Sequence, residues 1–170
     1  MPRYNKIQIA SMQGQAVIVG LNEVKVIKFG EKSVIGASDI DGGYIIALGS
    51  KHKGIMAHVD PSHDAVVTAM EQFEQAFNES RSEFTSESAA ACIMAAKLGG
   101  VTAIMLEETL DYMKDKMREL EIPHAVYKYD EVVQGAKASS GTACMVGNRV
   151  NPRLPSFFFE DQPIAWNQAI

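Results

Sequence analysis

The sequence has few of the features that mark secreted, membrane or nucleic-acid-binding proteins. Its two cysteines, Cys92 and Cys144, are far apart in apolar surroundings, which favours buried reduced thiols over a disulfide framework. No run approaches the ~18 continuous apolar residues of a membrane span, and the first apolar stretch is too short for a signal peptide. The net charge is −5 and the basic residues are scattered, which argues against nucleic acid. We therefore expect a cytoplasmic protein without nucleic-acid or membrane partners.

Internal repeats and low-complexity linkers are also missing, and 170 residues suffice for one well-packed domain. We expect this domain over residues 1–150, followed by an aromatic C-terminal tail over 151–170. The tail contains three consecutive phenylalanines, Phe157 to Phe159, and Trp166. It is too apolar to lie free in water. It is therefore expected to pack on the domain or on a second copy of the chain, which would make a homo-oligomer.

The first sixty residues predict β-strands. Segments rich in β-branched residues alternate with glycine-containing turns. The predicted strands cover residues 15–19, 24–29, 34–37, 44–48 and 54–59.

After residue 60 the hydrophobic period becomes helical. Ser62 is a plausible helix cap, and apolar residues recur at i, i+4, i+7 and i+11 from Val66, which predicts a helix ending near Ser80. A second helix is predicted over 106–120, before Pro123.

The remaining segments complete an α/β pattern. Residues 89–98 fit a helix or a small-residue strand, and the glycines at 99–100 end either one. Late strands are predicted over 125–127 and 142–146. The expected fold class is therefore α/β, with helices packed on a mainly antiparallel or mixed sheet.

Residues 33–39 (Ser-Val-Ile-Gly-Ala-Ser-Asp) and His58 carry the most chemical information. The segment reads as a strand that leads Asp39 into a turn beside the strand that bears His58. An acid then stands where an active-site nucleophile would be expected.

The order of the elements resembles the chemoreceptor glutamine deamidases called CheD, which share a fold with cytotoxic necrotizing factor toxins. Residues 19–26 are similar to that family's opening strand pair, and 33–39 to its Thr-Leu-x-Leu-Gly-Ser-Cys stretch. Residues 54–58 (Gly-Ile-Met-Ala-His) resemble Gly-Gly-Met-Ala-His. Residues 96–100, the following helix and 121–123 resemble its Ala-Lys-x-Phe-Gly-Gly segment, helix and Gly-Ile-Pro. The likeness covers residues 15–147, although the family's last Gly-Gly…Gly-Arg stretch is poorly kept at 133–137.

The resemblance implies a single-domain α-β-β sandwich of CheD-like deamidase type. It also implies a site in which a Cys thiolate, activated by His and assisted by Thr, attacks a glutamine amide. The matching positions here are Asp39, His58 and Ser33. A carboxylate that attacks an unactivated amide would give an anhydride, which is a poor route, whereas a thiolate gives a thioester that water resolves. Cysteine-dependent deamidation is therefore disfavoured.

Two interpretations of the pair remain open. Asp39 and His58 could act as a carboxylate–imidazole pair for proton transfer, with Ser33 or Ser38 as a hydroxyl donor. A serine hydrolase with Ser38 as nucleophile is set aside, because neighbouring side chains on an extended strand point oppositely. Equally, Asp39 could cap a turn and His58 could be a core histidine.

Other uses of the polar residues are less well supported. His58, Asp60 and His63 could ligate a metal, but their spacing matches no strong signature, and helix capping by Asp60 and Asp64 is simpler. We expect no metal and no cofactor.

The leading hypothesis is a pocket enzyme that performs acid/base chemistry or amide hydrolysis on a small molecule or a glutamine-bearing protein. The alternatives are a non-catalytic module that binds a protein or itself through the inherited groove and the tail, and a residual deamidase.

Overall fold

The computed structural model describes residues 4–40, 42–85, 88–97, 101–130, 141–147 and 154–166, without the side chains of 97, 101–106 and 130. The glycines at 99–100, the stretch at 133–137 and the boundary at 150/151 lie outside the described residues. In chain order the elements are α1 (Lys6–Met12), β1 (Ala16–Ile18), β2 (Glu23–Lys28), β3 (Val34–Ile40), β4 (Tyr44–Ser50), β5 (Lys53–Val59), α2 (His63–Glu79), a 3-10 turn (Arg81–Glu83), β6 (Ala89–Lys97), α3 (Val101–Glu119), β7 (His124–Asp130), β8 (Gly141–Val146), β9 (Ser156–Phe159) and β10 (Gln162–Ile164).

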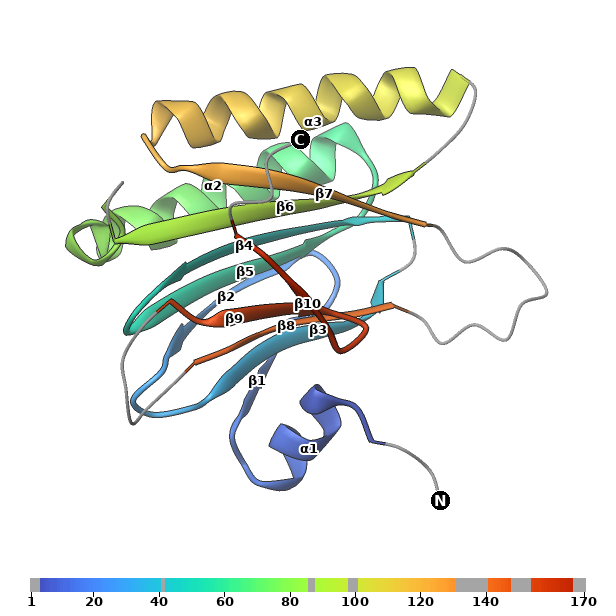
Figure 1. Cartoon of the computed structure of the whole chain (residues 1–170). Helices are drawn as coiled ribbons and strands as arrows, with labels where there is room; N and C mark the ends of the chain where they lie inside the picture. The colour runs from blue at the N-terminus through green and yellow to red at the C-terminus, as the bar shows by residue number, and fades with distance from the viewer. Residues whose placement is uncertain are drawn as a thin grey trace.

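The described strands form two five-stranded mixed sheets that pack face to face (Figure 1). Sheet A has the order β1-β3-β8-β9-β10, and sheet B has the order β2-β5-β4-β6-β7. The β1–β3 and β6–β7 pairs are parallel, and the other pairs are antiparallel. Helices α2 and α3 cover the outer face of sheet B, and α1 lies against the outer face of sheet A. The predicted α/β class is thus confirmed.

Sheet B is buried on both faces at its centre. Every residue of β4 is buried, and so is every residue of β5 after Lys53. Alternate side chains enter two separate cores, one beneath the helices and one between the sheets. This double burial explains why these two strands read as nearly continuous apolar runs.

Both predicted helices are confirmed. The Ser62 hydroxyl accepts the N–H of Ala65 at 3.2 Å, and α2 places Val66, Phe73 and Phe77 in the core beneath the helices. Helix α3 includes the predicted range almost completely and begins five residues earlier, at Val101. No helix of the described residues is both long and apolar enough to cross a membrane.

The segment that the sequence left open is the strand β6. Its small side chains alternate between the two cores: Ala91 and Ile93 face the helices, and Cys92 and Met94 face sheet A. Alanine favours a helix by its intrinsic propensity, so the pairing with β4 and β7 decides the structure against that local preference.

Helix α1 is an element that the sequence analysis did not predict. Asn5 and Gln8 form a reciprocal capping box at its start. The helix buries Ile7 and Ala10 against Val34 and Cys144 on the outer face of sheet A.

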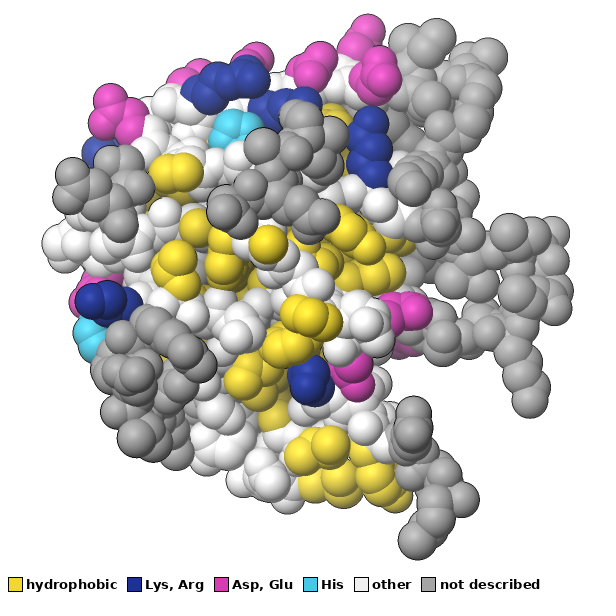
Figure 2. Space-filling view, in the orientation of Figure 1, with side chains coloured by type: hydrophobic (Ala, Val, Ile, Leu, Met, Phe, Trp, Pro, Cys, Tyr) yellow, Lys and Arg dark blue, Asp and Glu magenta, His cyan; other side chains and the backbone are white. Residues whose placement is uncertain are grey.

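The described part of the tail forms β9 and β10 within sheet A. Phe157 is 1% exposed, its ring centroid lies 5.3 Å from that of Trp166, and the Trp166 indole N–H donates to the Pro155 carbonyl at 2.6 Å. Phe159 contacts Tyr127 of β7, with 5.9 Å between ring centroids. On the face of the molecule drawn in Figure 2, hydrophobic side chains lie across the middle, between β7 and β9. The aromatic side chains thus pack on their own chain and join the edges of the two sheets.

Candidate functional site

Asp39 lies on a β-bulge near the end of β3. The register with β8 runs regularly to Ala37↔Ala143 and resumes at Ile40↔Gly141, so that Ser38 and Asp39 together stand opposite a single residue. The φ of Asp39 is +57°, a left-handed conformation that Asp tolerates better than most residues. Ala37 and Ile40 both enter the core between the sheets, while Asp39 is exposed and Ser38 is half-buried. Regular alternation, which the sequence analysis assumed for Ser38 and Asp39, does not hold at this bulge.

His58 lies near the end of β5 and is 4% exposed. Its register partners are Glu23 of β2 and Ile45 of β4. Ile45 and Met56, which share its face of sheet B, belong to the core between the sheets. The imidazole therefore points from sheet B toward sheet A, the sheet that contains Asp39.

Burial is the largest influence on His58 and lowers the pKa of its imidazole, while the charges of Asp39 and Asp60 raise this pKa by less. The neutral imidazole is therefore favoured. Its Nδ1 atom is buried and has no hydrogen-bond partner in the structure. Asp39 thus acts on His58 through its charge and does not hold Nδ1 as an orienting carboxylate would.

Ser33 is not brought to this pair. It immediately precedes β3, where its N–H donates to the Gln15 carbonyl at 3.1 Å and its carbonyl accepts the Gly147 N–H at 2.9 Å. At about 3.3 Å per residue, six residues of strand separate it from Asp39 by roughly 20 Å. Of the four predicted site residues, the structure brings Asp39, Ser38 and His58 to one end of the sandwich and leaves Ser33 at the other.

His63, considered as a metal ligand with His58 and Asp60, is turned toward α3. Its Nδ1 lies 3.2 Å from the Thr109 hydroxyl, and its ring meets the edge of Tyr112 with centroids 5.5 Å apart. Among the described residues, no three His, Cys, Asp or Glu side chains gather closely enough to hold a metal ion.

Neither cysteine is placed to act as a nucleophile in this site. Cys92 belongs to the core between the sheets, and Cys144 lies beneath α1. Burial raises the pKa of each thiol to about 12, so both are protonated near neutral pH. The expectation of buried reduced thiols is confirmed.

Comparison with models of known protein families and with curated proteins gives no match.

Asn22 is a site residue that the sequence analysis missed. Its N–H donates to the His58 carbonyl at 2.6 Å, and its side chain accepts the Asp60 N–H at 3.0 Å. The available signal was an Asn in the turn-like spacer between two strands, where Asn often adopts a left-handed conformation.

A buried contact fixes the turn next to Asp39. The Tyr129 hydroxyl of β7 donates to the Gly43 carbonyl at 2.6 Å. Gly43 also lies so close to the Val59 carbonyl that a Cβ would clash. Gly43 is therefore held against both β5 and β7, four residues after Asp39.

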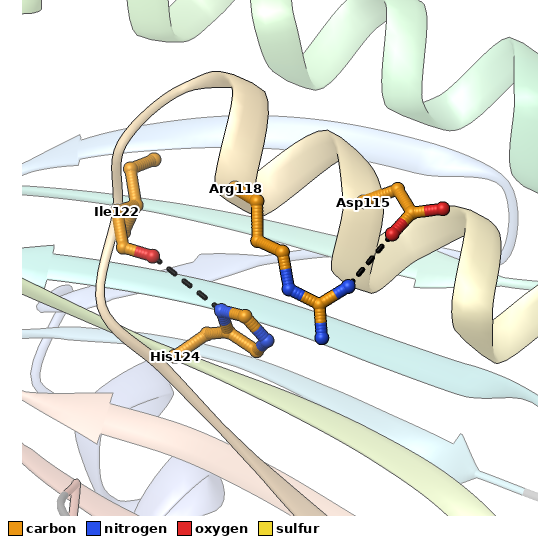
Figure 3. Close-up of polar contacts among 4 residues, drawn as sticks. All are labelled: Asp115, Arg118, Ile122 and His124. Carbon is orange, nitrogen blue, oxygen red and sulfur yellow. Dashed lines mark hydrogen bonds and ion pairs between the residues drawn. The ribbon is translucent and has the colours of Figure 1, made fainter.

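A second partly buried histidine lies at the corner between α3 and β7 (Figure 3). His124 Nδ1 is 3.4 Å from the Ile122 carbonyl, and the Arg118 guanidinium nearby is paired with Asp115 at 2.7 Å. Burial lowers the pKa of His124; the hydrogen bond with Ile122 raises it, and the charges of Arg118 and Lys114 lower it further. In this view the His124 ring lies beside Arg118, and the Asp115 carboxylate lies on the far side of the guanidinium.

A hollow of about 530 Å³ lies on the C-terminal half of α2 and contains neither Asp39 nor His58. It is open and lined by Glu71, Glu74, Gln75, Asn78 and Glu79. A single acidic helix face of this kind is ordinary solvated surface.

Proposed function

We propose that the chain is a CheD-like α-β-β sandwich without the family's cysteine, and that it is a pocket enzyme with His58 as general base and Asp39 as its carboxylate partner. The observation that carries this proposal is a buried, neutral imidazole with an unpartnered Nδ1, near the carboxylate of an exposed residue in a left-handed conformation. Unusual backbone conformations and perturbed titrating groups both concentrate at functional sites.

In amide hydrolysis, His58 would take a proton from water, and the water oxygen would use the freed electron pair to form a bond to the carbonyl carbon as the C=O π pair moves onto the carbonyl oxygen. The imidazolium would then return this proton to the leaving nitrogen as the C–N bond breaks, releasing ammonia from a primary amide. The pair on the carbonyl oxygen re-forms the C=O bond when the leaving nitrogen departs. Burial disfavours the imidazolium, which favours the second transfer, while the charges of Asp39 and Asp60 keep the cation accessible. Ser38, on the same bulge, could donate a hydrogen bond to the substrate.

The test is ammonia release from a panel of small primary amides and from a glutamine-containing peptide. Wild type should release ammonia, and His58→Gln should reduce the rate by at least ~100-fold, the usual contribution of a general base. His52→Gln is the matched control, because His52 is exposed in the turn between β4 and β5. Equal rates for wild type and His58→Gln would contradict the proposal, and a wild type without ammonia release would exclude amide hydrolysis.

A further inference from the structure

Asn22 stands where the chain enters β2, beside the end of β5. Its φ is +61°. In this conformation its N–H reaches the His58 carbonyl at 2.6 Å, and its Oδ1 accepts the Asp60 N–H at 3.0 Å. These two groups belong to the peptide units on either side of Val59. A single residue thus holds both of them.

The side chain of Asn22 replaces backbone pairing that β2 does not supply. The register of β2 with β5 runs from Lys28↔Lys53 to Glu23↔His58 and ends there. Beyond that point the Asn22 amide oxygen takes the place of a strand carbonyl for the Asp60 N–H. The turn that presents Asn22 is itself closed, because the Glu23 carboxylate accepts the Gly20 N–H at 2.7 Å.

The end of β5 matters because water lies just outside it. Asp60 and Asn22 are exposed, whereas His58 and Val59 are buried. An end that opened at Val59 would replace the buried surroundings of the imidazole with bulk solvent and alter its direction relative to Asp39 on β3. Two carboxylates act on His58 at this end of β5, Asp39 on β3 and Asp60 after β5, and Glu23 on β2 is the register partner of His58.

We infer that Asn22 is a positioning residue for His58: by holding both peptide units that flank Val59, it keeps the end of β5 closed and the imidazole directed between the sheets. Its relevance to catalysis rests on the proposed function, whereas its action on His58 does not.

The test uses the full chain with ¹⁵N-labelled histidine for NMR titration, together with amide hydrogen exchange. Asn22→Gly keeps the left-handed conformation and removes only the side-chain bond. It should move the pKa of His58 up toward the ordinary value of about 6.5 and speed the exchange of the Asp60 amide at least ~tenfold. Asn22→Asp retains a side-chain acceptor, so the Asp60 amide should exchange as slowly as in wild type.

The control is Asn5→Gly, which removes a comparable side-chain bond, the 2.8 Å contact with the Gln8 N–H on α1. This control should leave the pKa of His58 and the exchange rate of the Asp60 amide as in wild type. The inference is overturned if Asn22→Gly leaves both readouts unchanged, or if it speeds exchange equally at Ile93 in β6, since that would be global destabilisation. If Asn22→Gly shifts the pKa of His58 while His58→Gln leaves ammonia release intact, the proposed function fails and the positioning role of Asn22 stands.

Discussion

The end of β5 holds a buried histidine and the corner between α3 and β7 holds a partly buried one, but the charges around the two rings have opposite signs. Carboxylates of Asp39 and Asp60 act on His58, whereas the cations Arg118 and Lys114 act on His124. Burial lowers the pKa of both. The charges near His58 partly offset the effect of burial on its protonation, whereas the charges near His124 add to that effect. Only the first arrangement suits a residue that must gain and lose a proton in each catalytic cycle.

The sharpest way to break this comparison places one thiol at position 39, next to His58, and a second at position 115, on the far side of Arg118 from His124. Asp39→Cys and Asp115→Cys both replace exposed aspartates. Under the proposed function, His58 takes the proton of a thiol at position 39, whereas Asp115 pairs with Arg118 and makes no contact with His124. We expect Asp39→Cys to react with iodoacetamide at pH 6 at least ~tenfold faster than Asp115→Cys.

Alkylation rates followed by mass spectrometry check this prediction. The native thiols give little background because both are buried with a pKa of about 12. Ammonia release from a glutamine-containing peptide by Asp39→Cys would also support the CheD-like assignment. Equal alkylation rates for the two variants would show that position 39 gives a thiol no special activation.

Acid stability gives the next largest difference. The folded-state pKa of His58 is lowered, so its contribution to stability is complete above the unfolded pKa of about 6.5 and is lost as the pH falls through the lower folded value. His58→Gln should therefore flatten the dependence of the unfolding free energy on pH below 6.5. His124→Gln should flatten it less, because His124 is only partly buried and relaxes more easily into water.

Urea unfolding at several pH values between 5 and 7.5, followed by the fluorescence of Trp166, measures this dependence. A His58→Gln slope equal to that of wild type would mean that His58 does not stay neutral in the folded protein.

The residues of the candidate site differ in how far the sequence predicts their positions. Strand β5 and the position of His58 follow from a run of apolar residues between glycine-containing turns. The approach of Asp39 to His58 depends on a bulge in β3, and a bulge leaves almost no signal in local periodicity. The resemblance placed Ser33 in the site from its spacing to Asp39 along the chain. In the structure, strand β3 runs between the two residues, so the same spacing puts them at opposite ends of the strand. Asn22 was missed because its partner Asp60 lies 38 residues away.

Charge removal should shift the two histidines in opposite directions. Asp39→Asn removes an anion and should lower the pKa of His58, whereas Arg118→Gln removes a cation and should raise that of His124. Each change should leave the other histidine unaffected, since the two lie on different strands of sheet B. NMR titration of both rings in each variant provides the measurement. A shift of the same sign at both rings would contradict the assignment of opposite surroundings.

The smallest change in unfolding free energy is expected for the exposed residues at the corner between α3 and β7. Asp115 and Arg118 form an i,i+3 pair whose side chains are 66% and 64% exposed, and exposed pairs of this kind contribute about 0–1 kcal/mol. Asp115→Ala should therefore change the unfolding free energy by under ~0.5 kcal/mol, because alanine also favours the helix. Asp39→Ala should cost more, because alanine is strained at a φ of +57°. Asp39→Gly removes the same carboxylate without that strain and should recover the difference in urea unfolding. If Asp39→Ala and Asp39→Gly were equally stable, the backbone at the bulge would be free to relax, and the conformation of Asp39 would no longer support a functional role.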